Sequence, residues 1–344
     1  MKKAKTLALV ALGLLAAGGG AAWWLTRTEP IPEVLEAVED DPAVIEIPGL
    51  EGQPPLRLDA LEGKTAFFVV IGTWSAKSPE GEATNRALSR WTFPEGVRGF
   101  IVADAAGMGV FSDRIEATMS SYASEMRFPL YVDYDGAFVD TFKLPKGHHG
   151  LVVLGPDGEI LQRHSGGLEG EALEALRDTL GATEPEPGPA MPALQAGTLD
   201  TESCAQTVCA FVYTGTEAVK TADVPGIRPG GFEGDDDTRL AQMLKPAVRN
   251  VTLARKMKLD TTTKGVFIGD IDPGITSEGW ARLSLDESAE ARDALGLGDE
   301  PAIVVYDHGR EALRHTGLVP LHLWGRIADL LQVEGFNDRR PPRG

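Results

Sequence analysis

Two stretches of the chain repeat one pattern, and this repeat constrains the fold more than any other feature. "LVVLGPDGEILQRHSG" (residues 151–166) lines up without gaps on "AIVVYDHGREALRHTG" (302–317), at a constant offset of 309 − 158 = 151 residues. Each copy reads as an apolar strand, a turn containing glycine and a second strand, which is the pattern of a β-hairpin. A helix-like segment follows each copy. The repeat therefore predicts two domains of one fold.

Length and linker composition agree with two domains. The chain has 344 residues, and domains commonly span about 100–200 residues. Prolines crowd "EPEPGPAMP" and proline and glutamate are frequent between residues 28 and 56, which favours a linker and a stalk. The predicted parts are a signal anchor (1–27), a stalk (28–56), a first domain (57–182), a linker (183–197), a second domain (198–336) and a tail (337–344).

Strand-like and helix-like patterns alternate through the first domain, which indicates an α/β fold. The run "TAFFVVIG" is a buried strand by its continuous apolar and β-branched character. The elements follow in the order strand (65–72), helix (79–91), strand (97–104), helix (112–126), strand and turn (128–136), hairpin (149–166) and helix (170–180).

The second domain matches this order near its end and less well near its start. "VCAFVYTG" (208–215) is the predicted central strand, and residues 238–257 the predicted helix after it. Between them lies a loop rich in Gly, Pro and Asp (216–237). Residues 264–275, "KGVFIGDIDPGI", read as an insertion, and residues 280–317 as strand, helix and hairpin.

The N-terminus carries a membrane-directing signal. Lys2, Lys3 and Lys5 precede an uncharged run from Thr6 to Thr26, long enough to span the hydrocarbon core. Cleavage as a signal peptide and retention as an anchor are both open, and we favour the anchor. Lysines on the inner side predict that the domains lie outside the cytoplasm.

The first domain resembles the membrane-anchored thioredoxin-like proteins of the bacterial cell envelope, a family of thiol–disulfide oxidoreductases. The resemblance spans roughly residues 57–182 and is carried by "GTWSAKS", "VDYDGAFVDTFKL" and "VVLGPDGEIL". It implies two tandem thioredoxin-like domains, each a central mixed sheet flanked by helices, behind an N-terminal transmembrane helix.

The family's Trp-Cys-x-x-Cys motif is incomplete here. Trp74 matches the tryptophan, whereas Ser75 and Ser78 stand where the resemblance places both cysteines. A serine hydroxyl can neither form the attacking thiolate nor resolve a mixed disulfide. We interpret Ser75 as a helix N-cap and Ser78 as a residue of the first turn. The sequence therefore predicts a pseudoenzyme with no catalytic residue at this position.

The family also places a cis-proline before the hairpin. In the first domain His149 or Gly150 stands there, so both halves of the redox site are missing. In the second domain Pro301 matches the cis-proline.

The sequence contains two cysteines, Cys204 and Cys209. Their separation does not match the redox motif. A small structural disulfide and a buried free thiol on the apolar strand are both open, and a reactive pair facing Pro301 is the least favoured reading.

No metal or cofactor is predicted. His148 and His149 are neighbours without further ligands. The acidic loop with Glu233 and Asp235 to Asp237 matches no EF-hand, and is interpreted as solvated and helix-capping.

The leading hypothesis is a non-catalytic binding or scaffold protein of the cell envelope, anchored in the inner membrane with its domains on the periplasmic side. Its expected partners are the membrane and other envelope or membrane proteins. The net charge of −18 argues against nucleic acid. A thiol–disulfide oxidoreductase using Cys204 and Cys209, or a metal- or cofactor-handling protein, is the alternative.

Overall fold

The computed structural model divides the chain into two compact units, Met1–Glu184 (unit 1) and Pro185–Gly344 (unit 2). The predicted anchor and the predicted tail lie outside the described residues. No helix within the described part of the chain is long and apolar enough to cross a membrane. The structure describes residues 31–32, 35–38, 45–50, 52–72, 81–106, 116, 119–120, 123, 126–196, 199–224, 227–228, 231–232, 245–259 and 262–333.

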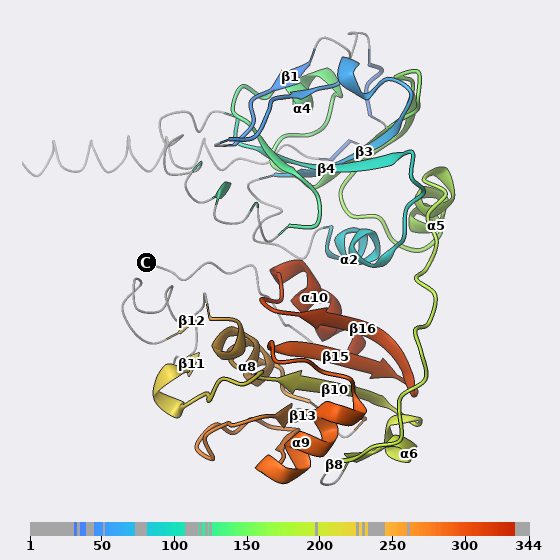
Figure 1. Cartoon of the computed structure of the whole chain (residues 1–344). Helices are drawn as coiled ribbons and strands as arrows, with labels where there is room; N and C mark the ends of the chain where they lie inside the picture. Colours follow the sequence, from blue (N-terminus) through green and yellow to red (C-terminus); the bar gives the residue numbers. More distant parts are fainter. Residues whose placement is uncertain are drawn as a thin grey trace, which may run out of the picture. The chain divides into compact units, whose positions relative to one another are not determined.

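Unit 1 is built on a mixed five-stranded sheet with the predicted apolar strand at its centre (Figure 1). Strand β3 (Thr65–Ile71) is parallel to β4 (Val97–Asp104), and β4 is parallel to β5 (Leu130–Asp133). On its other side β3 is antiparallel to β6 (Gly150–Leu154), which is antiparallel to β7 (Ile160–Ser165). The order is β5-β4-β3-β6-β7, so β7 is an edge strand.

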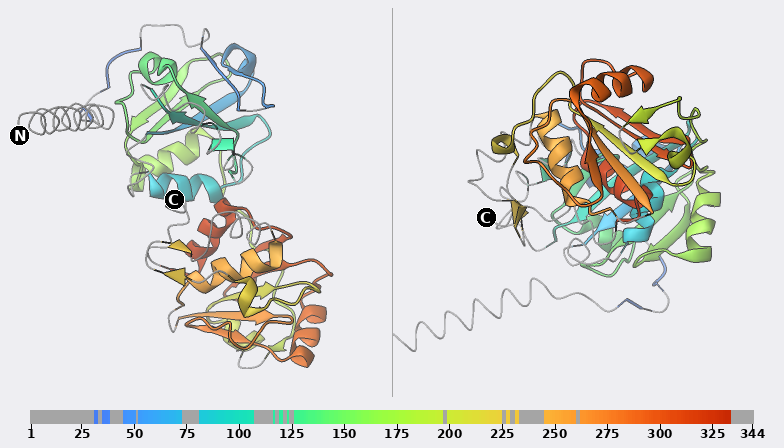
Figure 2. Two further views of the ribbon diagram at one scale, coloured as in Figure 1. Left: turned by 90° about the vertical axis from the view of Figure 1, so that its left-hand side faces the viewer. Right: turned by 90° about the horizontal axis from the view of Figure 1, so that it is seen from below.

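Side-chain alternation along β3 explains why both faces of this sheet are covered. Phe67 packs beneath α2 (Glu82–Arg90) and α5 (Gly170–Thr179), whereas Phe68 packs on the opposite face with α4 (Ala137–Thr141). Both rings are fully buried, and burying one such side chain contributes about 2–3 kcal/mol. Figures 1 and 2 both show α2 and α5 on one face of the sheet.

Part of the predicted stalk (28–56) belongs to the folded core of unit 1. Strands β1 (Glu46–Ile47) and β2 (Leu56–Arg57) form a short antiparallel pair. Ile47 and Leu56 are buried in the same cluster as Phe68, so this stretch completes the core of unit 1. The prediction weighed proline and glutamate content, while the alternating apolar residues decide the packing.

Unit 2 repeats this sheet arrangement in the order β14-β13-β10-β15-β16. The central β10 (Val208–Tyr213) is parallel to β13 (Thr263–Ile268), which is parallel to β14 (Trp280–Arg282). On its other side β10 is antiparallel to β15 (Ala302–Asp307), which is antiparallel to β16 (Arg310–Thr316). The matching order and directions make each unit a mixed α/β sheet flanked by helices, consistent with thioredoxin-like domains.

Alternation along β10 again divides the core in two. Val212 packs with α8 (Pro246–Lys256) and α10 (Leu321–Leu330). Phe211 packs on the other face with residues of α9 (Leu285–Ala294). The remaining short elements are the 3-10 helices η2 (Asp59–Leu61) and η5 (Thr221–Asp223), α6 (Thr201–Cys204), β8 (Gln195–Ala196), β9 (Leu199–Asp200), β11 (Ile227–Arg228) and β12 (Gly231–Phe232).

The structure corrects one sequence interpretation of unit 2 and tests part of another. Residues 264–275 are not an insertion, because most of the apolar run forms β13, the parallel neighbour of β10. Residues 238–244 of the predicted helix (238–257) lie outside the described residues, and in the rest α8 begins at Pro246, whose fixed φ and missing N–H suit a first helical position.

The predicted linker also contributes to unit 2. Met191 and Leu194 are buried in its core. Residues 188–191, here called the edge segment, pair with the start of β16: the Gly188 N–H donates to the Glu311 carbonyl at 2.8 Å and the Glu311 N–H to the Pro189 carbonyl at 2.9 Å. The edge of this sheet is therefore covered at that end.

The repeated hairpins align in space with one gap. Leu151 pairs with His164, and Ile303 with His315. The second strands are thus related by 315 − 164 = 151 residues, as predicted, but the first strands by 303 − 151 = 152. The physical reason is the turn, which is one residue shorter in unit 2. There it places His308 and Gly309 at positive φ between paired Asp307 and Arg310.

Candidate functional site

The candidate site of unit 1 is the end of β3 nearest α2, here called the unit 1 corner. It comprises Gly72, Gly81, Gly147, His149 and Asp104. The predicted site residues Trp74, Ser75 and Ser78 lie outside the described residues. The structure describes the residues before and after them, and the loop that precedes β6.

A close backbone approach defines the floor of the corner. A Cβ atom placed on Gly72 would lie 2.0 Å from the carbonyl carbon of Gly147 and 2.5 Å from the nitrogen of His148. No side chain fits there, so glycine is required where β3 ends. The approach fixes the turn after β3 against the loop before β6.

His149 forms the wall of the corner. Its side chain is 1% exposed, and its Nδ1 lies 3.2 Å from the Gly166 carbonyl oxygen, to which the Nδ1–H tautomer donates. The Gly166 N–H donates in return to the His149 carbonyl at 2.7 Å. A Cβ on Gly81 would lie 2.1 Å from the His149 ring, so the imidazole packs directly against the start of α2.

The strand register decides which residue replaces the family's proline. Because the first hairpin strands are related by 152 residues, Pro301 corresponds to 301 − 152 = 149. His149 therefore occupies the position, and Gly150 is the first residue of β6.

Asp104 of the corner and its neighbour Asp133 lie at the carboxyl ends of adjacent strands. Asp104 and Asp133 are paired in register between β4 and β5, and both are buried. Asp104 accepts hydrogen bonds from the Ala106 and Gly147 N–H groups, each at 3.1 Å. Asp104 thus ties the corner loop to β4.

Asp133 caps the next element. It accepts hydrogen bonds from the Ala137 and Phe138 N–H groups at 3.0 and 2.9 Å, at the start of α4. Burial raises the pKa of Asp133, and the nearby Asp104 charge adds to the rise. The sequence analysis did not single out either aspartate, although each directly follows a buried strand, which is a readable signal.

Unit 2 has an equivalent corner at the end of β10. A Cβ on Gly215 would lie 2.6 Å from the Asp299 carbonyl oxygen and 2.8 Å from the Pro301 nitrogen. The Thr216 N–H donates to the same Asp299 carbonyl at 3.1 Å. Pro301 thus lies where the family's proline is expected. Its peptide bond is trans, since no described peptide bond is cis, and this corrects the expected cis isomer.

Cys204 and Cys209 form a disulfide, with Cα atoms 5.6 Å apart. Both residues are fully buried, in the core between β10 and α9. The structural-disulfide interpretation agrees with the structure, and the free-thiol alternative does not. The bond joins α6 to the beginning of β10.

The disulfide lies at the wrong end of β10 to face Pro301. Cys209 pairs with Tyr306 and Tyr213 pairs with Ala302, the residue after Pro301. The four residues from 209 to 213 correspond to about 13 Å of strand. The predicted alternative of a redox pair facing Pro301 is therefore wrong in its geometry.

The described part of both corners carries hydrogen-bonding and packing groups. Within that part there is no cluster of three or more His, Cys, Asp or Glu side chains arranged to hold a metal ion. His148 and His149 do not form such a cluster, and the acidic loop (233–237) lies outside the described residues. What the unit 1 corner offers chemically is a set of close-packed backbone groups and one buried imidazole, that of His149.

Comparisons with known proteins found similarity to solved structures alone: no protein-family model and no curated protein matches the sequence. The exposed lipoprotein thioredoxin of Streptococcus pneumoniae is 16% identical, covering 40% of this chain and 97% of its own, with a TM-score of 0.32. A secreted disulfide oxidoreductase of Mycobacterium tuberculosis is 17% identical, covering 41% and 98%, with a TM-score of 0.29. Peroxiredoxin Q of Xanthomonas campestris is 16% identical, covering 44% and 97%, with a TM-score of 0.28.

Proposed function

We propose that this chain is a non-catalytic thioredoxin-like binding protein of the bacterial cell envelope, anchored in the inner membrane by residues 1–27. Its two units lie on the periplasmic side and act as a subunit or accessory of a membrane protein assembly. The observation that carries the proposal is the state of the cysteines. The sequence has only two, and they are bonded to each other, buried, and remote from the corner of their unit.

The unit 1 corner supports a binding role. Its floor and wall are fixed by the Gly72 approach and by the reciprocal hydrogen bonds of His149 with Gly166. Groups held in this way lose little conformational freedom when a partner binds beside them. Trp74 follows Gly72 closely in the sequence. Large aromatic side chains are frequent binding hot spots.

An affinity pull-down from detergent-solubilised membranes tests the proposal. The intact chain should recover a defined partner at near-stoichiometric yield, and Trp74→Ala should weaken recovery. Leu285→Ala is the matched control, because Leu285 is an exposed apolar side chain of unit 2. Recovery of no partner by the intact chain contradicts the binding role. Recovery that is insensitive to Trp74→Ala keeps the role and moves the surface elsewhere.

A thiol–disulfide oxidoreductase using Cys204 and Cys209 is the second candidate, favoured by the presence of a bonded pair in an α/β unit. This activity requires a thiolate to attack one of two buried sulfurs. We expect the purified chain to reduce insulin no faster than a Cys204→Ala/Cys209→Ala variant. A faster wild-type rate would replace the binding proposal with the enzyme. Intact mass spectrometry of the native protein tests the metal- or cofactor-handling alternative in the same preparation.

A further inference from the structure

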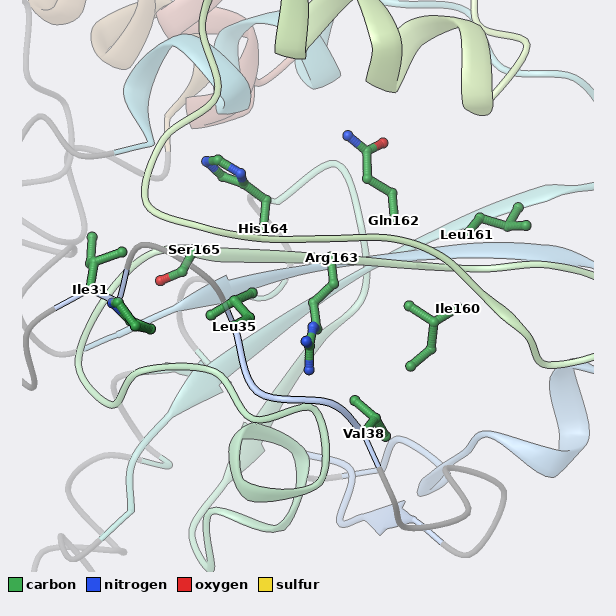
Figure 3. A pocket seen from close by; sticks show the side chains of 10 residues that line it. Ile31, Leu35, Val38, Ile160, Leu161, Gln162, Arg163, His164 and Ser165 are labelled. Carbon is green, nitrogen blue, oxygen red and sulfur yellow. The ribbon is translucent and has the colours of Figure 1, made fainter.

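The described residues of unit 1 enclose a groove of about 680 Å³ along the edge strand β7 (Figure 3). One wall is β7 itself, and the other is formed by Ile31, Pro32, Leu35 and Val38. No residue of the unit 1 corner lines the groove, and the groove plays no part in the proposed function. Its lining residues are Ile31, Pro32, Leu35, Val38 and the six residues of β7.

The outer edge of β7 carries backbone N–H and C=O groups that pair with no described strand. Strand β6 is its only sheet neighbour among the described residues, so its outer N–H and C=O groups face no strand. Side chains from both faces of β7 border the groove: in Figure 3 Arg163 points toward Leu35 and Val38, and Gln162 and His164 point to the other side. A chain lying in the plane of the sheet would meet both sets.

The equivalent edge strand of unit 2 is paired with an extended segment of the chain itself. Strand β16 corresponds to β7, and the edge segment (188–191) bonds to it through the Glu311 and Gly309 backbone. The second copy of this sheet thus already accepts an added extended segment at the edge where the described residues of unit 1 place no further strand. Edge strands of this kind commonly receive peptides by strand addition.

Exposed apolar side chains gather at the groove. Among the described residues, the large hydrophobic side chains that remain exposed are Ile31, Leu161 and Leu285, and the first two line it. In Figure 3 they lie at opposite ends of β7, so the groove offers an apolar contact toward each end of a bound segment.

The charge of the groove favours an acidic group in the occupant. Arg163 and His164 are the ionisable residues of the lining, in a chain whose acidic residues outnumber Lys and Arg by 51 to 33. The Arg163 guanidinium donates to the carbonyls of Phe142, at 2.7 Å, and Glu36, and no carboxylate of the described residues pairs with it. Burial lowers its pKa, so a nearby carboxylate would stabilise its charge.

We propose that the outer edge of β7 binds an extended peptide segment of a partner protein, with apolar side chains toward Ile31 and Leu161 and a carboxylate toward Arg163. The segment adds as a further strand to the unit 1 sheet. This inference goes beyond the binding role proposed for the corner and is independent of Trp74.

Fluorescence anisotropy with the full chain tests this proposal. The probe is a labelled, capped peptide of about seven residues, roughly the length of β7, alternating valine and threonine around one central glutamate. We expect saturable binding that Leu161→Glu weakens about tenfold or more, and that Trp74→Ala leaves unchanged. Leu285→Glu, the same change at an exposed leucine in unit 2, is the matched control and should have no effect.

Two peptide variants test the chemistry. Glutamine in place of the glutamate should weaken binding about threefold to tenfold at low salt. A central proline should abolish binding, since proline cannot donate to a strand. Hydrogen exchange should slow within residues 160–165 on binding.

Several results would overturn the proposal. Absence of saturable binding, equal loss in Leu285→Glu, or undiminished binding of the proline peptide each would do so. Concentration-dependent dimerisation abolished by Leu161→Glu would assign the edge to a second copy of the chain instead. Loss of peptide binding together with retained pull-down would remove this surface and leave the proposed function standing.

Discussion

Reduction of the Cys204–Cys209 disulfide should destabilise unit 2 by a modest and calculable amount. The cysteines are separated by 5 residues in sequence, so the bond closes a short loop in the unfolded chain. The chain-entropy relation for a loop of this size gives about 2 kcal/mol at 25 °C. A disulfide that closes so short a loop contributes far less to stability than the hydrophobic core does. Unit 2 should therefore remain folded when the disulfide is reduced.

The loss translates into measurable shifts. For a domain of roughly 150–200 residues, about 2 kcal/mol lowers Tm by about 4–8 °C. With a urea m-value of about 2 kcal/mol/M, the unfolding midpoint falls by about 1 M. The assay is hydrogen exchange by mass spectrometry across a urea series, because peptides from β3 and β10 report the two units separately.

Unit 1 supplies the internal control. It contains no cysteine, so its transition must not move when the reductant is added. The Cys204→Ala/Cys209→Ala variant should be insensitive to reductant in both units. An unchanged midpoint of unit 2, or an equal shift of both units, would refute the reasoning.

The rate of reduction carries a second test of the same bond. Both cysteines are fully buried, so attack by dithiothreitol must await opening of α6 or β10. We expect native reduction to be much slower than reduction in urea. Reduction as fast as that of an exposed disulfide would favour the oxidoreductase alternative.

Two further predictions concern unit 1. Gly81→Ala should lower the free energy of unfolding of unit 1 by about 1–3 kcal/mol more than Gly63→Ala does, as measured by urea unfolding. Both glycines have positive φ, but only Gly81 faces the His149 ring. Equal losses in the two variants would contradict this packing. Burial raises the folded pKa of Asp133 above that of the unfolded chain, about 3.9, so its contribution is present below that pH and is lost as pH rises through the folded pKa. Wild type should therefore lose stability relative to Asp133→Asn as the pH rises from about 3 to about 7. A stability difference that does not change with pH would disprove the raised pKa.

Much of the fold follows from local sequence patterns. The apolar runs of β3 and β10 fix two strands buried on both faces, and the repeated hairpin indicates a second copy of one arrangement. Where the pattern was mixed, prediction failed for identifiable reasons. Residues 28–56 were interpreted as a stalk because of their proline and glutamate content, although Ile47 and Leu56 are buried in the core. Residues 264–275 were interpreted as an insertion because the resemblance did not reach them.

The candidate site was less readable than the fold. The resemblance left His149 and Gly150 as alternatives, and only strand pairing assigned the position to His149. The edge groove could not be predicted from the sequence, because its two walls lie far apart in the chain. They are connected by the hydrogen bond from Arg163 to the Glu36 carbonyl.

The sequence by itself determined the absence of a Cys-x-x-Cys motif and the limit of two cysteines, because these are properties of residue identity. It also determined which strands are apolar on both faces, because that depends on local pattern alone. The tertiary structure decided that the cysteines are bonded and remote from Pro301, that His149 packs on Gly81, and that β7 pairs with β6 alone among the described strands. These depend on which strands pair and in which register, and register is set by contacts between residues distant in sequence.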